Sequence, residues 1–121
     1  MRRIRAVEEA AEAAQKDGHV PGGIHQSIGQ EAIAAGVCAN LERSDLLTSN
    51  HRGHGHTLAK GADPTAMMRE LFGKAGGTCQ GKGGSMHIAD FDIGLLGATG
   101  ALAAGILIAL GAAPALTLPG Q

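Results

Sequence analysis

No charged residue occurs from Ile93 to Leu118, and this uncharged run restricts the possible folds more than any other feature. Its length would suffice to cross a lipid bilayer. However, it is rich in glycine and alanine, contains Pro114, and lacks the flanking Lys, Arg, Trp or Tyr residues that anchor membrane helices. A buried, glycine-rich helix of an α/β protein has the same pattern. We therefore expect an α/β fold with this segment packed inside it, and no membrane span.

Composition and charge narrow the class of protein further. A formal net charge of −1, no Trp and no Tyr argue against nucleic-acid binding. Cys38 and Cys79 are too few for a disulfide framework, and the basic N-terminus runs into Glu8 and Glu9 rather than an apolar signal segment. A reducing, cytoplasmic setting is expected. Because small side chains bury little apolar area, we also expect the chain to need a partner for stability.

Three helices are predicted from apolar periodicity and from helix start and stop signals. The first covers residues 2–16. The second is expected to open at Ser27, which fits an S-x-x-Q capping box with Gln30. The third is expected to start at Asp63-Pro64, with Asp at the N-cap and Pro in the first turn. The apolar faces assigned to these helices are Ile4, Val7, Ala11 and Ala14; Ile28, Ile33, Val37 and Leu41; and Met67, Met68, Leu71 and Phe72.

A short strand is predicted over residues 46–49, and residues 73–84 are predicted to form a loop because half of these positions are glycine. Residues 85–92 are expected to be irregular. One short strand does not make a sheet, so the sheet is expected to lie mostly outside this chain. The predicted fold class is α/β, with mostly helices and glycine-rich loops in one partial domain over residues 1–121.

Three of the six histidines gather between His51 and His56 around Arg52. The spacing H-x2-H-x-H could ligate zinc. Against zinc, Gly53 and Gly55 would leave the loop flexible, and the arginine places a positive charge beside the metal. Arginine binds phosphate oxygens through two parallel hydrogen bonds, and glycines let backbone amides approach an anion. We predict an anion-binding loop, with a zinc site and a solvated loop as alternatives.

Two further segments carry polar groups that suit an anion. Lys82, Ser85 and His87 lie among glycines, an arrangement that fits either a phosphate site or an exposed turn. His25 precedes the second predicted helix and could lie near an anion at its N-terminus. Residues 76–83 resemble a nucleotide-binding P-loop, but position 83 is Gly where Ser or Thr would hold magnesium. We therefore do not interpret this stretch as a P-loop.

Four separated blocks carry a resemblance to a known family. They are GGIHQSIGQEAIAAG (22–36), SDLLTSNHRGHGHTLAKG (44–61), MMRELFGKAGGTCQGKGGSMHIAD (67–90) and GLLGATG (94–100). Together they resemble the α subunit of thiamine-diphosphate-dependent E1 dehydrogenases, which include the pyruvate, branched-chain 2-oxo acid and acetoin enzymes. The resemblance covers about residues 4–111, and HRGHGH and SMHIADFD look most like the acetoin branch. It implies the N-terminal part of a thiamine-diphosphate-binding fold.

The resemblance assigns roles to residues by their position in these blocks, with no metal ligand among them. The cofactor-binding residues that it implies are Arg52 and His51 for the diphosphate, and the backbone of Gly94 and Leu96 for the aminopyrimidine ring. The catalytic residues that it implies, at the entrance or mouth of the active site, are His25, His54 and His87.

The resemblance also implies a reaction and partners. Thiamine diphosphate would carry the cleavage of acetoin, or the decarboxylation of pyruvate or another 2-oxo acid, and the acyl unit would pass to a lipoyl group on E2. The working unit would be an α2β2 tetramer with a β subunit. A non-catalytic chain that still pairs with a β subunit is an open alternative.

The family motif that holds Mg²⁺, GDG followed by an Asn, does not occur in residues 1–121. The chain instead continues from Gly111 through Pro114 and Pro119. Without this motif, the diphosphate charge would rest mainly on Arg52, the histidines and Lys82. We therefore expect a shortened α subunit that binds the cofactor weakly and is inactive alone.

Overall fold

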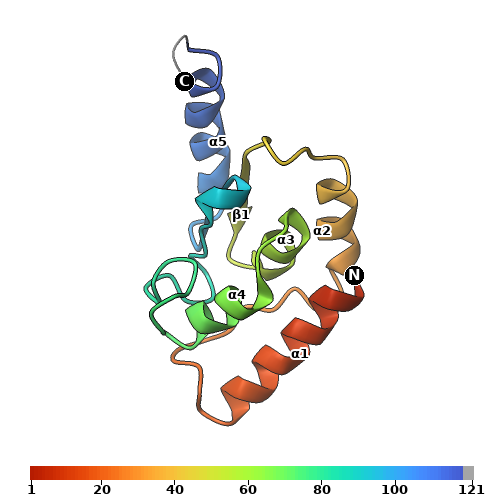
Figure 1. Cartoon of the computed structure of the whole chain (residues 1–121), viewed down its shortest axis with the longest axis vertical. Helices are drawn as coiled ribbons and strands as arrows, with labels where there is room; N and C mark the ends of the chain where they lie inside the picture. Colours follow the sequence, from red (N-terminus) through yellow and green to blue (C-terminus); the bar gives the residue numbers. More distant parts are fainter. Residues whose placement is uncertain (119–121) are drawn as a thin grey trace.

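The structure, a computed structural model, describes residues 1–118 as helices arranged around a small sheet (Figure 1). Helices α1 to α4 form the body of the molecule, and α5 extends away from it. The elements are α1 (Arg2–Lys16), α2 (Glu31–Cys38), β1 (Leu47–Asn50), α3 (His54–Lys60), α4 (Pro64–Leu71), the 3-10 helix η1 (Phe91–Ile93), β2 (Leu95–Thr99) and α5 (Ala104–Ala115).

The two strands pair in parallel, with Thr48 opposite Gly97 and Asn50 opposite Thr99. A parallel pair needs a long crossover connection, which here contains α3, α4 and the glycine-rich loop. The predicted α/β class is confirmed, and the predicted strand is β1, shifted by one residue. β2 is not predicted, because it lies within the uncharged run, where glycines interrupt any alternating pattern.

Helices α1 and α4 confirm their predictions. α1 covers residues 2–16 and buries Ile4 and Ala11. The Asp63 side chain caps α4 by accepting hydrogen bonds from the backbone N–H groups of Thr65 and Ala66. Residues 73–84 form no helix or strand, as predicted. The largest fully buried apolar side chains of the core are Met67, Leu71, Ile88 and Leu95.

The prediction that the second helix opens at Ser27 is wrong. α2 begins at Glu31, because Gly29 adopts a left-handed conformation with φ 86° that a helix cannot contain. The Ser27 hydroxyl donates a hydrogen bond of 2.6 Å to Glu8 instead of capping the helix. A contact with a distant helix therefore replaces the local capping box.

The apolar face predicted for the second helix is also wrong. Ile33 and Val37, which were assigned to the core, are 59% and 49% exposed. α2 packs against α3 through Ala34, whose Cβ would lie 3.3 Å from a Cβ added at Gly55. The larger apolar side chains of α2 therefore face away from the body.

The histidine block is not the flexible loop that its glycines predict. α3 begins at His54, inside the block. A Cβ at Gly55 would lie 2.9 Å from Ser27 Oγ, so only glycine lets α3 approach this closely. The glycines here permit close packing rather than flexibility.

The uncharged run divides into β2 and α5 rather than forming one buried helix. No α5 residue is buried, and Ile106 and Leu107 are 71% and 72% exposed. α5 lies against the sheet, where Thr48 Oγ1 donates a hydrogen bond of 3.0 Å to the carbonyl of Gly105. The expectation of a buried helix is therefore wrong for residues 1–118. Within this range, no helix combines the length and apolar character needed to cross a membrane.

Candidate functional site

The carboxyl ends of the two strands form the candidate site. Because β1 and β2 are parallel, Asn50 and Thr99 end at the same edge of the sheet, which is where α/β proteins bind ligands. We call residues 50–52 and 99–103, which follow from these strand ends, the binding edge. A cavity of about 270 Å³ opens beside it, lined by both strand ends and the start of α5.

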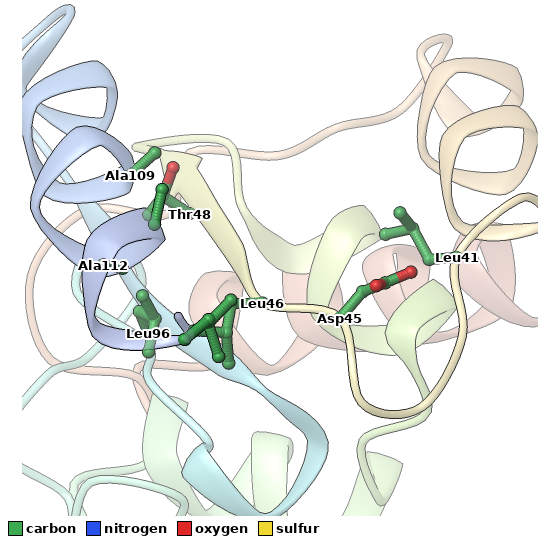
Figure 2. Close-up of a pocket in the computed structure, with 9 residues that line it drawn as sticks. Leu41, Asp45, Leu46, Thr48, Leu96, Ala109 and Ala112 are labelled. Carbon is green, nitrogen blue, oxygen red and sulfur yellow. The ribbon is translucent and has the colours of Figure 1, made fainter. Parts of the chain in front are cut away.

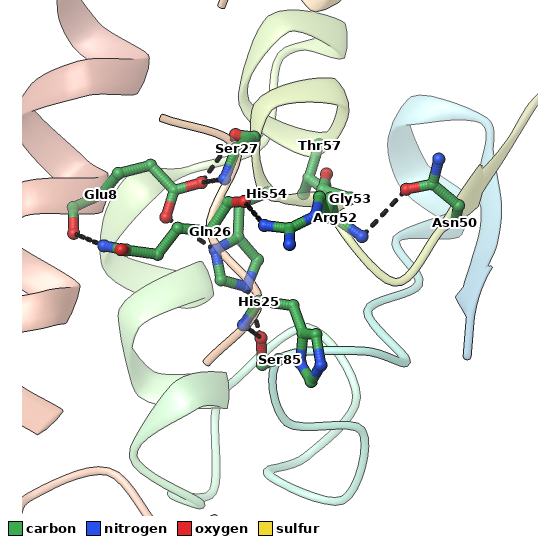
Figure 3. Close-up of polar contacts among 10 residues, drawn as sticks. All are labelled: Glu8, His25, Gln26, Ser27, Asn50, Arg52, Gly53, His54, Thr57 and Ser85. Carbon is green, nitrogen blue, oxygen red and sulfur yellow. Dashed lines mark hydrogen bonds and ion pairs between the residues drawn. The ribbon is translucent and has the colours of Figure 1, made fainter. Parts of the chain in front are cut away.

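Arg52 extends an exposed side chain from the binding edge. Its guanidinium donates a hydrogen bond to the Gln26 carbonyl, and its backbone N–H donates one of 2.9 Å to Asn50 Oδ1 (Figure 3). Among residues 1–118, its other guanidinium N–H groups have no partner. A guanidinium group carries a permanent positive charge, and two of its N–H groups can bind phosphate oxygens in bidentate geometry.

His25 and His51 lie beside each other, with ring centroids 5.4 Å apart and ring planes at 86°. The Nδ1 atoms of both rings are buried and have no hydrogen-bond partner among residues 1–118. Buried polar atoms are rarely left unpaired in native proteins. Two such atoms, in residues adjacent in the chain to Arg52 and to its partner Gln26, indicate a place for a polar ligand.

His54 does not line an open site, although it was expected near the mouth of one. Its side chain is wholly buried at the start of α3. Nδ1 lies 3.0 Å from Glu8 Oε2, and Nε2 lies 3.0 Å from Ser85 Oγ. The Ser85 hydroxyl in turn accepts a hydrogen bond of 2.9 Å from the backbone N–H of His25. His54 therefore connects α1 to the segment that carries His25 (Figure 3).

The carboxylate of Glu8 is wholly buried at the centre of this group. Its Oε1 accepts hydrogen bonds from the Ser27 backbone N–H (2.8 Å) and hydroxyl (2.6 Å). Burial, the largest single influence, raises the pKa of the Glu8 carboxyl, but the interactions with His54 and Ser27 together lower it below its ordinary value. Glu8 is therefore ionised at neutral pH.

The three histidines of the block have separate partners. His51 faces His25, His54 binds Glu8 and Ser85, and His56 Nδ1 lies 2.7 Å from Ser49 Oγ. Burial lowers the pKa of His56, so its imidazole is neutral at pH 7. Within residues 1–118, no three His, Cys, Asp or Glu side chains converge as metal ligands would. This geometry does not support the zinc-module alternative.

The glycine-rich loop is organised by Glu70, a second wholly buried carboxylate. Its pKa is raised by burial, the largest influence, but is lowered overall by the hydrogen bonds from the loop. A Cβ at Gly77 would lie 2.5 Å from Glu70 Oε2, so the glycines allow the loop to wrap around the carboxylate. The loop amides that donate to Glu70 are those of Cys79 (2.7 Å), Gly81 (2.8 Å), Gly83 (2.6 Å) and Gly84 (3.1 Å).

Comparison with known proteins identifies the family. The family model of the dehydrogenase E1 component matches residues 1–121. The chain belongs to this family. Among its relatives is the α subunit of acetoin:2,6-dichlorophenolindophenol oxidoreductase from Bacillus subtilis, 52% identical over 113 residues (93% of this chain and 34% of the relative). The same subunit from Cupriavidus necator is 49% identical over 121 residues (100% and 36%).

A more distant E1 relative is the pyruvate dehydrogenase E1 component subunit alpha-3, chloroplastic, of Arabidopsis thaliana. It is 39% identical over 109 residues, covering 90% of this chain and 26% of the relative. The chain thus spans about a third of the length of the acetoin relatives and about a quarter of the pyruvate relative. Enzymes of the E1 family depend on thiamine diphosphate.

The E1 chain brings only some of the residues assigned by resemblance to the binding edge. Arg52, His51 and His25 lie together there. The His87 side chain is exposed. It lies beside the carboxyl end of β2, where a Cβ added at Gly100 would be 3.7 Å from the His87 Cε1. These four residues therefore remain candidates for contact with a ligand.

Gly94 and Leu96 lie at the other end of the sheet. Gly94 adopts φ 76° just before β2, and its carbonyl accepts a hydrogen bond of 2.8 Å from the Leu47 N–H. At roughly 3.3 Å per residue, Gly94 is about 16 Å along the strand from its carboxyl end. Leu96 lines a separate cavity of about 370 Å³ between the sheet and α5 (Figure 2). The role of Gly94 and Leu96 as aminopyrimidine contacts stays a prediction.

Two residues of the site, Glu8 and Glu70, carry no motif that sequence reasoning could use. Glu8 lies on the helix face that also buries Ile4 and Ala11, which is an unusual place for a charge. The spacing of Ile4, Glu8 and Ala11 along α1 is the one signal that could have marked it. Glu70 offers a similar signal, because it is adjacent to Leu71 and one turn from Met67.

The binding edge fits a diphosphate better than a metal. Arg52 supplies N–H donors that have no partner among residues 1–118, and the buried Nδ1 atoms of His25 and His51 can each bind a polar ligand atom. The part of the chain that the structure describes has no cluster of ligands for Mg²⁺. Residues 1–118 therefore fit the diphosphate group of the family cofactor and do not supply a site for its metal.

Proposed function

We propose that this chain supplies one wall of the thiamine-diphosphate site of an E1 α-type subunit, as part of a cofactor-binding domain over residues 1–121. The enzyme would cleave acetoin or decarboxylate pyruvate or another 2-oxo acid, and would pass the acyl unit to a lipoyl group on E2. The observation that carries this proposal is that Arg52 follows His51 and binds the carbonyl of Gln26, next to His25, while the Nδ1 atoms of both imidazoles have no partner among residues 1–118.

In this proposal, Arg52 anchors the diphosphate through its free guanidinium donors, and His51 adds a hydrogen bond from its ring. His25 lies on the substrate side, where its Nδ1 can hold or release a proton. His87, beside the carboxyl end of β2, lies at the entrance of the proposed site. When bound, the cofactor would supply the carbon nucleophile for cleavage of the bond beside the substrate carbonyl. The protein residues bind and orient it and exclude water from one side.

Acetoin is the substrate that the comparisons favour. The two acetoin relatives are 52% and 49% identical to this chain, whereas the plant pyruvate relative is 39% identical. The blocks HRGHGH and SMHIADFD point to the same branch. Pyruvate is the runner-up substrate.

A β subunit and E2 are the proposed partners, in an α2β2 assembly in a reducing, cytoplasmic compartment. Both cysteines are free thiols, which is compatible with that compartment. Large apolar side chains of α2 and α5 are exposed, and such surfaces usually mark an interface. The alternative is a chain that pairs with a β subunit but has no catalytic activity. An assay of acetoin cleavage by the copurified pair distinguishes this alternative from the proposed enzyme subunit.

The binding proposal is tested by calorimetric titration of the chain with inorganic pyrophosphate and with thiamine diphosphate, with and without Mg²⁺. We expect weak binding that Mg²⁺ does not strengthen, because residues 1–118 offer no metal cluster. Replacing Arg52 by Gln should weaken pyrophosphate binding about tenfold or more, since a hydrogen bond to a charged group contributes roughly 1.5–3 kcal/mol.

The matched control is Arg43→Gln, which removes an exposed arginine side chain outside the binding edge. It should leave the affinity unchanged apart from a small effect of net charge. Equal affinities of the Arg52→Gln and Arg43→Gln proteins, or no binding of pyrophosphate at millimolar concentration by the wild-type chain, would overturn the proposal.

A further inference from the structure

One residue, Glu8, is linked by hydrogen bonds to every residue of the segment 25–27. Glu8 binds Ser27 directly through two hydrogen bonds of 2.8 and 2.6 Å. The backbone carbonyl of Glu8 accepts a hydrogen bond of 2.9 Å from Gln26 Nε2. Glu8 reaches His25 through His54 and Ser85, as Figure 3 shows. Burying a charge is costly, so a buried carboxylate in a residue with this many contacts needs a structural reason.

Counting protons fixes the direction of the hydrogen bonds in this group. The Ser85 hydroxyl has one proton and already accepts a hydrogen bond from the His25 N–H. It can donate that proton to His54 Nε2, 3.0 Å away, only if Nε2 carries none. The ring proton is then on Nδ1, which donates to Glu8 Oε2 at 3.0 Å.

The other protonation states leave buried groups unsatisfied. If His54 carried its proton on Nε2 alone, the lone pair of Nδ1 would face the Glu8 carboxylate. If both nitrogens were protonated, Nε2 would donate to Ser85, and the hydroxyl proton of Ser85 would have no acceptor among residues 1–118. An unsatisfied buried polar group costs roughly 1–3 kcal/mol. The neutral Nδ1–H tautomer alone satisfies every donor and acceptor.

We propose that Glu8 is the positioning residue of the binding edge, acting directly on Ser27 and, through neutral Nδ1–H His54 and Ser85, on His25. All bonds of this relay point toward the carboxylate, an arrangement in which each bond polarises and strengthens the next. The relay holds the His25 ring against His51 and holds the Gln26 carbonyl where it receives Arg52. The effect of this relay on ligand binding rests on the proposed function, in which Arg52 and His51 bind a diphosphate.

This proposal gives His54 a different part from the catalytic one that the resemblance implies. A wholly buried ring with both nitrogens engaged cannot touch a ligand at the binding edge. Its effect on the reaction would pass through the geometry of His25 and Arg52.

The first test measures the tautomer of His54 in the unmodified chain by ¹⁵N NMR of the histidine rings at pH 7. We expect one protonated nitrogen, Nδ1, and one unprotonated nitrogen, Nε2, with slow exchange of the ring proton. An Nε2–H tautomer or a doubly protonated ring would overturn the relay. This measurement needs neither a variant nor a ligand.

The second test follows His25 and Arg52 in variants. Ser85→Ala should speed hydrogen exchange of the His25 amide by about tenfold or more and shift the Arg52 Nε signal. Ser44→Ala, which removes an exposed hydroxyl, should do neither. Glu8→Gln should act in the same way as Ser85→Ala, with Glu9→Gln on the exposed side of α1 as its control. Wild-type His25 and Arg52 signals in Ser85→Ala would overturn the proposal.

The two proposals fail separately. Should Glu8→Gln prevent folding, the wild-type tautomer and the Ser85→Ala spectra still decide the relay. Absence of pyrophosphate binding by the wild-type chain would overturn the proposed function, while the tautomer and exchange measurements would still decide whether Glu8 positions the segment.

Discussion

The Oε1 atom of Glu70 lies 2.6 Å from the backbone nitrogen of Gly83, and the two residues join α4 to the far side of the glycine-rich loop. Three more loop amides donate to the same carboxylate. The loop leads directly to Ser85 and His87, so Glu70 supports the candidate site from one side as Glu8 does from the other.

Replacing Glu70 by Gln should destabilise the chain by about 2–3 kcal/mol. The amide keeps the shape of the side chain, but its NH2 group cannot accept hydrogen bonds, so buried loop amides lose their acceptor. Urea unfolding measures the change, with Glu42→Gln at an exposed position as the control. A stability equal to that of the control would contradict the role assigned to Glu70.

Folding stability should fall when the pH drops below about 4.5. The pKa values of Glu8 and Glu70 are lower in the folded chain than in the unfolded chain. Hydrogen bonds that the Glu31 carboxylate accepts from Arg5 and from backbone N–H groups lower its pKa to about 2. A lowered carboxyl pKa stabilises the fold above the unfolded value, and the stabilisation is lost as the pH falls through the folded value.

Thermal unfolding between pH 7 and pH 3 measures this loss. Glu70→Gln should show a smaller decrease of Tm over this range than the wild-type chain, because one of the responsible carboxyls is gone. A wild-type Tm that stays constant from pH 5 to pH 3 would refute the prediction.

Two glycine-to-alanine substitutions should have opposite effects on stability. At Gly77, the new Cβ would lie 2.5 Å from Glu70 Oε2 and 2.7 Å from the Glu70 Cα, so backbone has to move and the loop should be destabilised by about 1–3 kcal/mol. At Gly36, within α2, the new Cβ meets nothing within 4 Å, and alanine should stabilise the helix by roughly 0.5–1 kcal/mol.

Equilibrium denaturation of Gly77→Ala, Gly36→Ala and the wild-type chain measures the free energies of unfolding that test both predictions. If Gly77→Ala were as stable as Gly36→Ala, the loop could not wrap Glu70 as closely as described. Hydrogen exchange of the loop amides would then locate the difference.

The sequence determined the elements whose signals are local. The apolar spacing of α1, the Asp63 cap of α4 and the glycine content of residues 73–84 each act within one turn or loop, and the structure has all three where they were predicted. The grouping of His51 and Arg52 after a strand was also readable, because residues adjacent in sequence are adjacent in space.

Tertiary contacts decided the rest. Ser27 looks like a helix cap, but its hydroxyl is taken by Glu8, 19 residues earlier in the chain. The glycines beside His54 look flexible, but they let α3 pack closely and bury the imidazole. The uncharged run looks like one buried helix, but pairing with β1 makes its first part a strand.

The sequence of the Arg52 and histidine block thus predicts an anion site, but it does not predict the part that each histidine plays. Which imidazole stays available to a ligand and which becomes a buried link depends on where the carboxylate of Glu8 lies. No periodicity or spacing within the block carries that information, because the hydrogen bonds that decide it join residues far apart in the chain.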